Sequence, residues 1–196
     1  MAKKGQNLLP IAKVRLPADL KGVENGKLPK ELLRPIKPSG RMHHRAALGW
    51  LALQILAKRE NLDLAHVGDY RPYEQQVSLF MSRMKDFPDA KKAEQTTRKF
   101  EGKTWYLHQG APVATPSTSN HGWGLAIDAA LKLPNGQIAT ISTKPKNAKR
   151  SGLEFLLEYA EPCGFSWELQ SEAWHIRWVA GDQVPALVLD IIAQGA

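Results

Sequence analysis

The stretch Ser119-Asn-His-Gly-Trp-Gly-Leu-Ala-Ile-Asp128 holds the residues around which the rest of the chain is organised. It contains one histidine, two glycines and a single carboxylate. From Leu125 to Leu131 every second residue is apolar and lies on one face of a predicted strand, which leaves Asp128 on the opposite face between two alanines. A buried carboxylate without a partner is costly, and a metal ion would supply that partner.

A second stretch, Glu172-Ala-Trp-His175, has the same character. It leads into a predicted strand over 174–179, on which His175 takes the face opposite to the large apolar residues. His121 lies at an odd separation from Asp128, so on a straight strand the two side chains would point apart. We therefore expect the chain to turn between them, at the two glycines of the first stretch.

Two histidines and one carboxylate make a suitable catalytic zinc site, with the fourth position left for water. The predicted ligands are His121, Asp128 and His175. Zinc lowers the pKa of a bound water to roughly 7, but attack on a peptide carbonyl also needs a base. Glu172 can approach the metal without binding it if the chain turns just before His175.

The developing negative charge on the carbonyl oxygen, or a carboxylate of the substrate, also needs a positive group or hydrogen-bond donors. Arg71 and Ser119 are the candidates. Arg71 precedes a proline at a predicted junction between a strand and a helix, where side chains often face a cleft.

The remaining elements are mixed helices and short strands without a regular βαβ rhythm, which favours an α+β fold. The Pro- and Gly-rich residues 1–41 are expected to form an extended arm packed on the domain, with a helical turn near 30–33. Residues 42–196 would form one catalytic domain. Helices are predicted over 42–60, 72–87 and 153–160, and after an N-cap at Asp182, and Ser151 starts a capping box. Strands are predicted over 66–70, 125–131, 137–142 and 165–167. A short helix is expected over 91–99, and a strand or ordered loop over 104–108.

Composition excludes several other classes of protein. The 43% hydrophobic and 23% charged residues are typical of a soluble globular domain. A single cysteine, Cys163, excludes an internal disulfide and a Cys-rich zinc site, and we expect it to pack as a small apolar group. His43 and His44 are adjacent at the start of a predicted helix and face different ways, so we expect surface or cap residues and not a metal site.

The net charge of +8 favours anionic surroundings, with a mild basic cluster over 144–150. The sequence has no basic helix or basic-aromatic repeat of the kind that nucleic-acid modules carry, so no nucleic-acid partner is predicted. The first residues are basic but are not followed by an apolar segment, so no signal peptide and no membrane insertion are expected.

The motifs, in this order, resemble a known family. Ser119-x-His121-x-x-Gly124-x-Ala126-x-Asp128 is similar to the Ser-x-His-x-x-Gly-x-Ala-x-Asp signature of the zinc peptidases of peptidoglycan. Glu172-x-x-His175 resembles the second motif of that family, and residues 69–76 resemble its segment containing Tyr-Arg. The family includes the D-alanyl-D-alanine carboxypeptidases and dipeptidases of vancomycin resistance and the L-alanyl-D-glutamate endopeptidases of phage endolysins. The resemblance covers roughly residues 42–180 and favours the endolysin type.

The resemblance implies a fold of the hedgehog/DD-peptidase type, with an antiparallel sheet, helices packed on one side and a zinc site on the other. It also implies a role for each matching residue: His121, Asp128 and His175 as zinc ligands, Glu172 as general base and acid, Arg71 at the carbonyl oxygen or the substrate, and Ser119 and Gln76 as substrate contacts.

We therefore expect a monomeric zinc peptidase that hydrolyses the stem peptide of peptidoglycan. Two alternatives stay open: a D-alanyl-D-alanine carboxypeptidase in place of an endopeptidase, and a non-catalytic, zinc-stabilised protein of a virion or of the cell wall. The resemblance places the protein in the cytoplasm of an infected host and then at the cell wall, or in a virion. The sequence leaves the roles of the arm and of residues 88–116 open.

Overall fold

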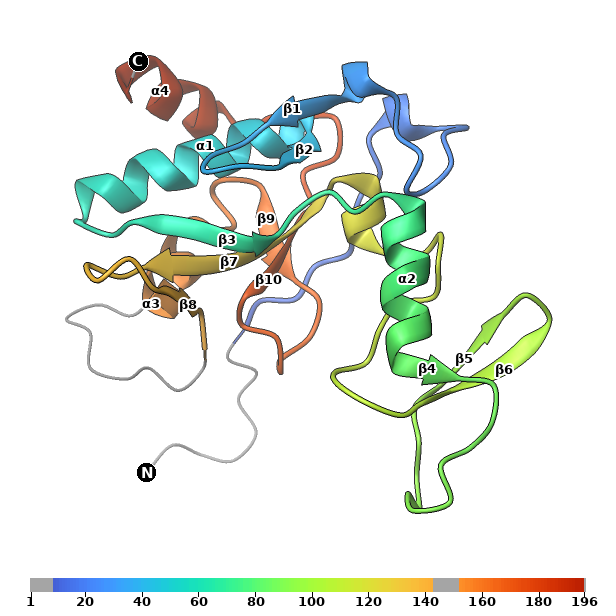
Figure 1. Cartoon of the computed structure of the whole chain (residues 1–196). Coiled ribbons are helices and arrows are strands. Elements are labelled where there is room, and N and C mark those ends of the chain that lie inside the picture. Colours follow the sequence, from blue (N-terminus) through green and yellow to red (C-terminus); the bar gives the residue numbers. More distant parts are fainter. Residues whose placement is uncertain (1–8, 143–151, 196) are drawn as a thin grey trace.

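The structure is a computed structural model that describes residues 9–142 and 152–195 (Figure 1). Its centre is a five-stranded antiparallel sheet in the order β3-β7-β10-β9, with β8 paired to β7. Because β7 and β10 are neighbours in register, Asp128 lies directly opposite His175. The strands are β3 (Leu64–Gly68), β7 (Ala126–Lys132), β8 (Ile138–Thr140), β9 (Phe165–Trp167) and β10 (His175–Trp178).

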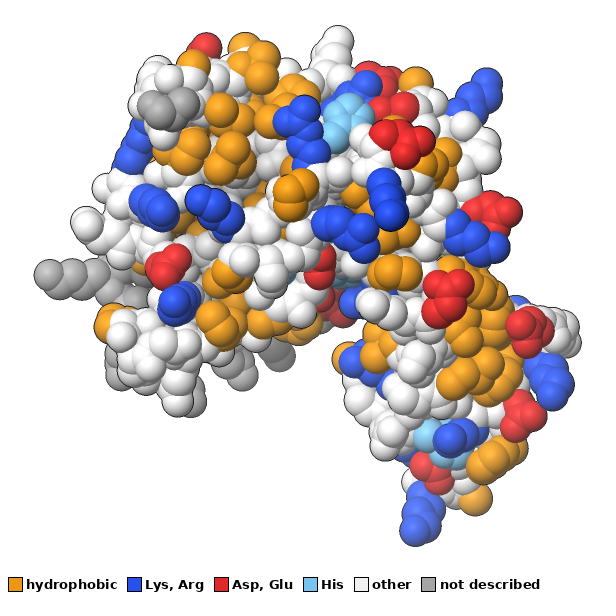
Figure 2. Space-filling view, turned by 45° about the horizontal axis from the view of Figure 1, so that its top comes forward, with side chains coloured by type: hydrophobic (Ala, Val, Ile, Leu, Met, Phe, Trp, Pro, Cys, Tyr) orange, Lys and Arg blue, Asp and Glu red, His pale blue; other side chains and the backbone are white. Residues whose placement is uncertain are grey.

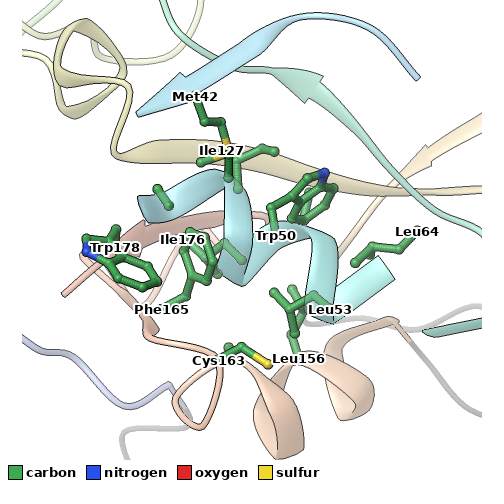
Figure 3. Close-up of a cluster of buried hydrophobic side chains, with 14 of the residues drawn as sticks. Met42, Trp50, Leu53, Leu64, Ile127, Leu156, Cys163, Phe165, Ile176 and Trp178 are labelled. Carbon is green, nitrogen blue, oxygen red and sulfur yellow. The ribbon is translucent and has the colours of Figure 1, made fainter. Parts of the chain in front are cut away.

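One face of this sheet carries the hydrophobic core (Figure 3). Trp50 and Leu53 of α1 (His44–Arg59) pack with Ile127 of β7 and Ile176 of β10, and all four side chains are fully buried. Helices α3 (Gly152–Tyr159) and α4 (Ala186–Gly195) contribute Leu156 and Val188 to the same core. The alternation along each strand therefore separates an apolar face, covered by helices, from the face that carries Asp128 and His175.

A smaller lobe projects from the main body below α2 (Tyr73–Arg83), as Figure 1 shows. It contains a three-stranded antiparallel sheet in the order β4-β6-β5. Phe80, Met84 and Val113 form a second buried cluster there, with the rings of Phe100 and Trp105 packed edge-on against Phe80 at centroid distances of 5.3 and 5.4 Å. The lobe therefore has its own core; its strands are β4 (Met84–Lys85), β5 (Thr97–Phe100) and β6 (Lys103–Leu107).

The N-terminal segment runs along the main body and buries Leu9, Leu20 and Leu28 in its core. The backbone of Gly26 in this segment bonds to two other parts of the chain. Its amide donates to the carbonyl of Gly122 (2.8 Å), and its carbonyl accepts from the amide of Tyr73 at the start of α2 (2.9 Å). The segment thus ties α2 to the turn after Ser119. Its elements are η1 (Ala18–Leu20), η2 (Lys30–Leu32), β1 (Leu33–Pro35) and β2 (Arg41–His43).

Most predicted elements form within a few residues of their expected bounds, but three expectations are wrong. The helix predicted over 72–87 ends at Arg83, because Met84 and the next residue pair with β6. The helix expected over 91–99 is absent, and β5 begins at Thr97. Asp182 caps no helix, since α4 begins only at Ala186. The basic cluster over 144–150 and the capping residue Ser151 lie outside the described residues.

His43 is the N-cap residue of α1, as expected, but the expectation that His43 and His44 face different ways is wrong, because both imidazoles face Asp19 on η1, at 3.0 and 2.8 Å. His43 precedes α1 with an extended backbone, so the rule for adjacent helical residues does not apply to this pair. Arg45 binds the same carboxylate. This cluster holds the N-terminal segment to the start of α1, and the guanidinium already serves as its cation.

Burial lowers the pKa of His43 from 6.5 to about 4, although Asp19 alone would raise it. The folded protein therefore keeps this ring neutral in a pH range where the unfolded chain binds a proton, so stability falls as the pH drops from 6.5 to 4. The free energy of unfolding of the wild type, minus that of His43→Gln, should decrease by about 3 kcal/mol over this range. Urea denaturation at several pH values measures the difference, and a pH-independent difference would contradict the assignment.

Candidate active site

The turn between His121 and Asp128 is a short 3-10 helix, η3 (Asn120–Trp123). It ends at Gly124, whose positive φ of 63° is costly for other residues. A Cβ at Gly124 would also lie 2.7 Å from the backbone nitrogen of His43. The predicted turn is confirmed, and it brings His121 back over the same face of the sheet as Asp128.

The three predicted ligand residues come together on the open face of the sheet. The Oδ1 atom of Asp128 lies 3.0 Å from Nδ1 of His175 and 3.5 Å from Nε2 of His121. One donor atom from each residue falls within 4.8 Å of the other two, which is the spacing that a single metal ion needs. Both histidines are buried, at 4% and 9% exposure of the whole residue, so packing restricts the positions of their rings.

The outer partners of the two histidines fix which nitrogen faces the centre. Nδ1 of His121 donates to the carbonyl of Asp69 at 2.9 Å. In the neutral ring Nε2 is therefore unprotonated, and its lone pair faces Asp128. For His175 the roles are reversed: Nδ1 faces Asp128, and Nε2 lies 3.6 Å from the carboxylate of Glu168. A carbonyl or carboxylate behind each imidazole is the usual arrangement around a metal-binding histidine.

The charges of the cluster support the same conclusion. Burial alone would raise the pKa of Asp128, but hydrogen bonds to His121 and His175 hold it well below its usual range. Burial would likewise lower the pKa of His175, but Asp128 and Glu168 raise it to about 9. The carboxylate is therefore ionised at neutral pH, and a cation bound here would replace the proton on His175.

Glu168, which the sequence analysis missed, directly follows β9 and forms part of the wall beside His175. Its carboxylate accepts from the side-chain amide of Asn120 (3.2 Å) and lies 3.5 Å from the guanidinium of Arg177. Hydrogen bonding to His175 lowers its pKa. No local sequence signal marks this residue, because its partners come from η3 and β10.

Glu172 lies where the chain turns before β10, and its carbonyl accepts from the amide of His175 at 3.0 Å. Its side chain is half-buried and lines the cleft with the three ligand residues. Within the described residues its carboxylate has no ion-pair partner, and its negative charge contributes to the raised pKa of His175. The turn just before His175 therefore brings Glu172 near the cluster, outside the ligand set.

Arg71 and Ser119 line the same cleft, which has a volume of about 380 Å³. Burial lowers the pKa of Arg71, whereas the nearby charge of Asp128 raises it. Ser119 is 5% exposed, and its backbone carbonyl accepts from the side-chain amide of Asn25 at 2.8 Å. In the described part of the chain the hydroxyl of Ser119 has no protein partner, so it is free to bind a ligand.

Gln76 lies behind Arg71 and is almost fully buried, at 2% exposure. Its Oε1 atom accepts from Nη1 of Arg71 (2.9 Å), and its amide donates to the carbonyl of Ala114 (2.7 Å). The structure therefore joins Gln76 to the site through Arg71, and the residue does not line the cleft itself.

Gly68 was not recognised from the sequence either. It lies opposite Asp128 at a register shift between β3 and β7, and a Cβ at this position would overlap the carboxylate of Asp128.

Replacing Gly68 by alanine should therefore push this ligand aside and weaken zinc binding about 10- to 100-fold, as for the loss of a residue that orients a ligand. Competition with a chromophoric chelator measures the affinity. The neighbouring Val67→Ala, on an exposed side chain, should bind zinc as the wild type does.

The chain is similar to known peptidases in sequence pattern and in fold. A family model described as VanY, D-alanyl-D-alanine carboxypeptidase, matches residues 39–181. No curated protein sequence matches the chain significantly. Among solved structures, a mutant of the vancomycin-resistance D,D-pentapeptidase VanY in complex with Zn(II) has a TM-score of 0.50 at 18% identity, over 84% of this chain and 88% of that one.

Two further solved structures resemble the chain with the same TM-score. The LD-carboxypeptidase LdcB has a TM-score of 0.50 at 20% identity, over 86% of this chain and 76% of that chain. The D,D-dipeptidase VanXYg, in complex with a D-Ala-D-Ala phosphinate analogue, has a TM-score of 0.50 at 18% identity, over 93% of this chain and 66% of that chain. These similarities confirm the predicted α+β fold of the DD-peptidase type. With the family match over residues 39–181, they show that the chain belongs to the VanY family of D-alanyl-D-alanine carboxypeptidases.

Proposed function

We propose that the protein is a zinc peptidase that hydrolyses a peptide bond in the stem peptide of peptidoglycan. The observation that carries this proposal is the convergence of His121, Asp128 and His175 in a cleft that Glu172 also lines. Two nitrogen donors and one carboxylate suit zinc in a catalytic site, which needs three protein ligands and an open fourth position. When bound, the zinc ion supplies a Lewis acid and lowers the pKa of water to roughly 7.

The protein residues supply the proton transfers and the orientation of the substrate. The carboxylate of Glu172 takes a proton from the attacking water and delivers it to the nitrogen of the leaving amine, so that one water and one peptide bond give an acid and an amine. The guanidinium of Arg71, held by Gln76, donates to the oxygen of the scissile carbonyl or to a carboxylate of the substrate. The hydroxyl of Ser119 binds the peptide beside it.

The family match and the neighbours support a substrate from the bacterial cell wall. The family model describes D-alanyl-D-alanine carboxypeptidases, and one structural neighbour binds a D-Ala-D-Ala phosphinate analogue. In the described residues no helix is long and apolar enough to cross a membrane. The cleft is open to the surface between the main body and the small lobe (Figure 2), so a peptide can reach the site from outside.

Incubation of the zinc-loaded protein with purified sacculi tests the proposal. Mass spectrometry of the soluble and insoluble products identifies the bond that is cut: release of D-alanine indicates a carboxypeptidase, and new amino termini within the stem indicate an endopeptidase. Sedimentation of the protein with sacculi but without either product would contradict the proposal and favour a non-catalytic wall-binding protein.

A further inference from the structure

The small lobe contributes two arginines to the catalytic cleft, and the proposed reaction does not use them. Arg83 is the last residue of α2, and Arg98 lies on β5. Both line the cleft that also contains the predicted zinc ligands. The lobe that carries them has its own aromatic core around Phe80, so their backbones are held in fixed positions.

Neutral carbonyl groups hold both guanidinium groups against the loop over 111–114. Nη1 of Arg83 donates to the carbonyl of Ala111 (3.1 Å), and Nε of Arg98 donates to the carbonyl of Val113 (3.1 Å). Nη1 of Arg98 donates to its neighbour's carbonyl, that of Thr97 (2.9 Å). These bonds orient the two guanidinium groups and leave each with its full positive charge. Among the residues that the structure describes, neither Nη2 atom has a hydrogen-bond partner, so both can donate to a ligand.

The charges in the cleft are unbalanced on this side. In residues 9–142 and 152–195, no carboxylate lies within 4 Å of Arg71, Arg83 or Arg98. Burial lowers the pKa of Arg71, and the positive charge of Arg83 lowers it further, whereas Asp128 raises it. Cations that repel one another in a partly desolvated cleft are stabilised when an anion enters between them.

The wall of the cleft that belongs to the main body carries negative charge. Glu168 and Glu172, on the chain that leads from β9 to β10, line the cleft across from the lobe. A peptide lying across the zinc ligands would therefore meet carboxylates on one side and guanidinium groups on the other. Figure 2 shows the hollow between the lobe and the main body in which such a peptide would lie.

We propose that Arg83 and Arg98 form a carboxylate subsite, which selects stem peptides bearing a free carboxylate away from the scissile bond. This inference rests on the proposed function, since it assigns the part of the stem peptide that the lobe recognises. Arginine suits this role because its planar fork donates two parallel hydrogen bonds to one carboxylate. The stem peptide offers such groups on its D-glutamate and diaminopimelate residues, and amidation removes the charge of either one.

Calorimetric binding to the zinc-loaded Glu172→Gln protein tests the subsite without hydrolysis. The ligands are two pairs of synthetic stem pentapeptides; within a pair, the α-carboxyl of D-glutamate, or the free carboxyl of diaminopimelate, is either ionised or amidated. At least one pair should show about 10- to 100-fold tighter binding of the acid, the usual value of hydrogen bonds to a charged group. Adding Arg83→Gln and Arg98→Gln together should remove this preference and leave binding of the amide unchanged.

Arg59→Gln, added to the same Glu172→Gln background, controls for the loss of a positive charge, because this exposed arginine lies at the end of α1, away from the cleft. It should keep the full preference for the acid. Equal binding of acid and amide in both pairs would overturn the proposal, and so would an equal loss for acid and amide in the double arginine variant, which indicates a purely structural role for the two arginines. Failure of the wild type to cut any stem peptide would overturn the proposed function, while the binding comparison still decides the subsite.

Discussion

Replacing Glu172 by glutamine should lower kcat for stem-peptide hydrolysis by about 10²- to 10⁴-fold, the usual contribution of a general base and acid. Glutamine has the same shape but cannot take up the proton of the attacking water. Because Glu172 lies outside the group of residues that converge as ligands, the variant should contain as much zinc as the wild type. Steady-state kinetics together with metal analysis of the purified protein measure both effects.

Glu168→Gln is the matched control, since it removes a carboxylate from the same wall of the cleft. Glu168 lies behind His175, so its loss should weaken zinc binding about 10- to 100-fold, and added zinc should restore most of the activity. Excess zinc should not rescue Glu172→Gln. Wild-type turnover by Glu172→Gln, or its rescue by zinc, would remove this residue from the role of base.

Replacing Asp128 by asparagine should reduce the affinity for zinc by more than about 100-fold, beyond the 10- to 100-fold effect expected for a residue that only orients a ligand. The carboxylate brings the negative charge that offsets part of the charge of the ion, and its Oδ1 atom lies within 3.5 Å of both imidazoles. An amide keeps the shape of the side chain but loses that charge. Equilibrium competition with a chelator, followed by an activity assay, tests both consequences.

Asp63→Asn is the control for this substitution, because Asp63 is an exposed residue before β3 and does not line the cleft. It should bind zinc and hydrolyse peptide as the wild type does. Dialysis of the wild type against a chelator should abolish activity, and added zinc should restore it. Full activity of metal-free protein, or unchanged zinc affinity in Asp128→Asn, would contradict the metal site.

The sequence by itself determined the central part of the site, because its signals are local. Alternation along a strand placed Asp128 and His175 on the faces that the structure shows, and the odd separation of His121 from Asp128 required the turn that Gly124 makes. Helix α1 and strand β9 follow from periodicity and flanking turns, which depend on neighbours a few residues away.

Only the tertiary structure decided the contacts between distant segments. His43 and His44 face Asp19 because the N-terminal segment packs against the start of α1. Helix α2 ends early because Met84 pairs with β6 more than twenty residues later in the chain. Residues as far apart as Gly68 and Glu168 meet Asp128 and His175 only through strand order. The physical reason is the same in each case: backbone periodicity is set within one turn or a few strand residues, whereas register, strand order and ion pairing depend on how the whole chain packs.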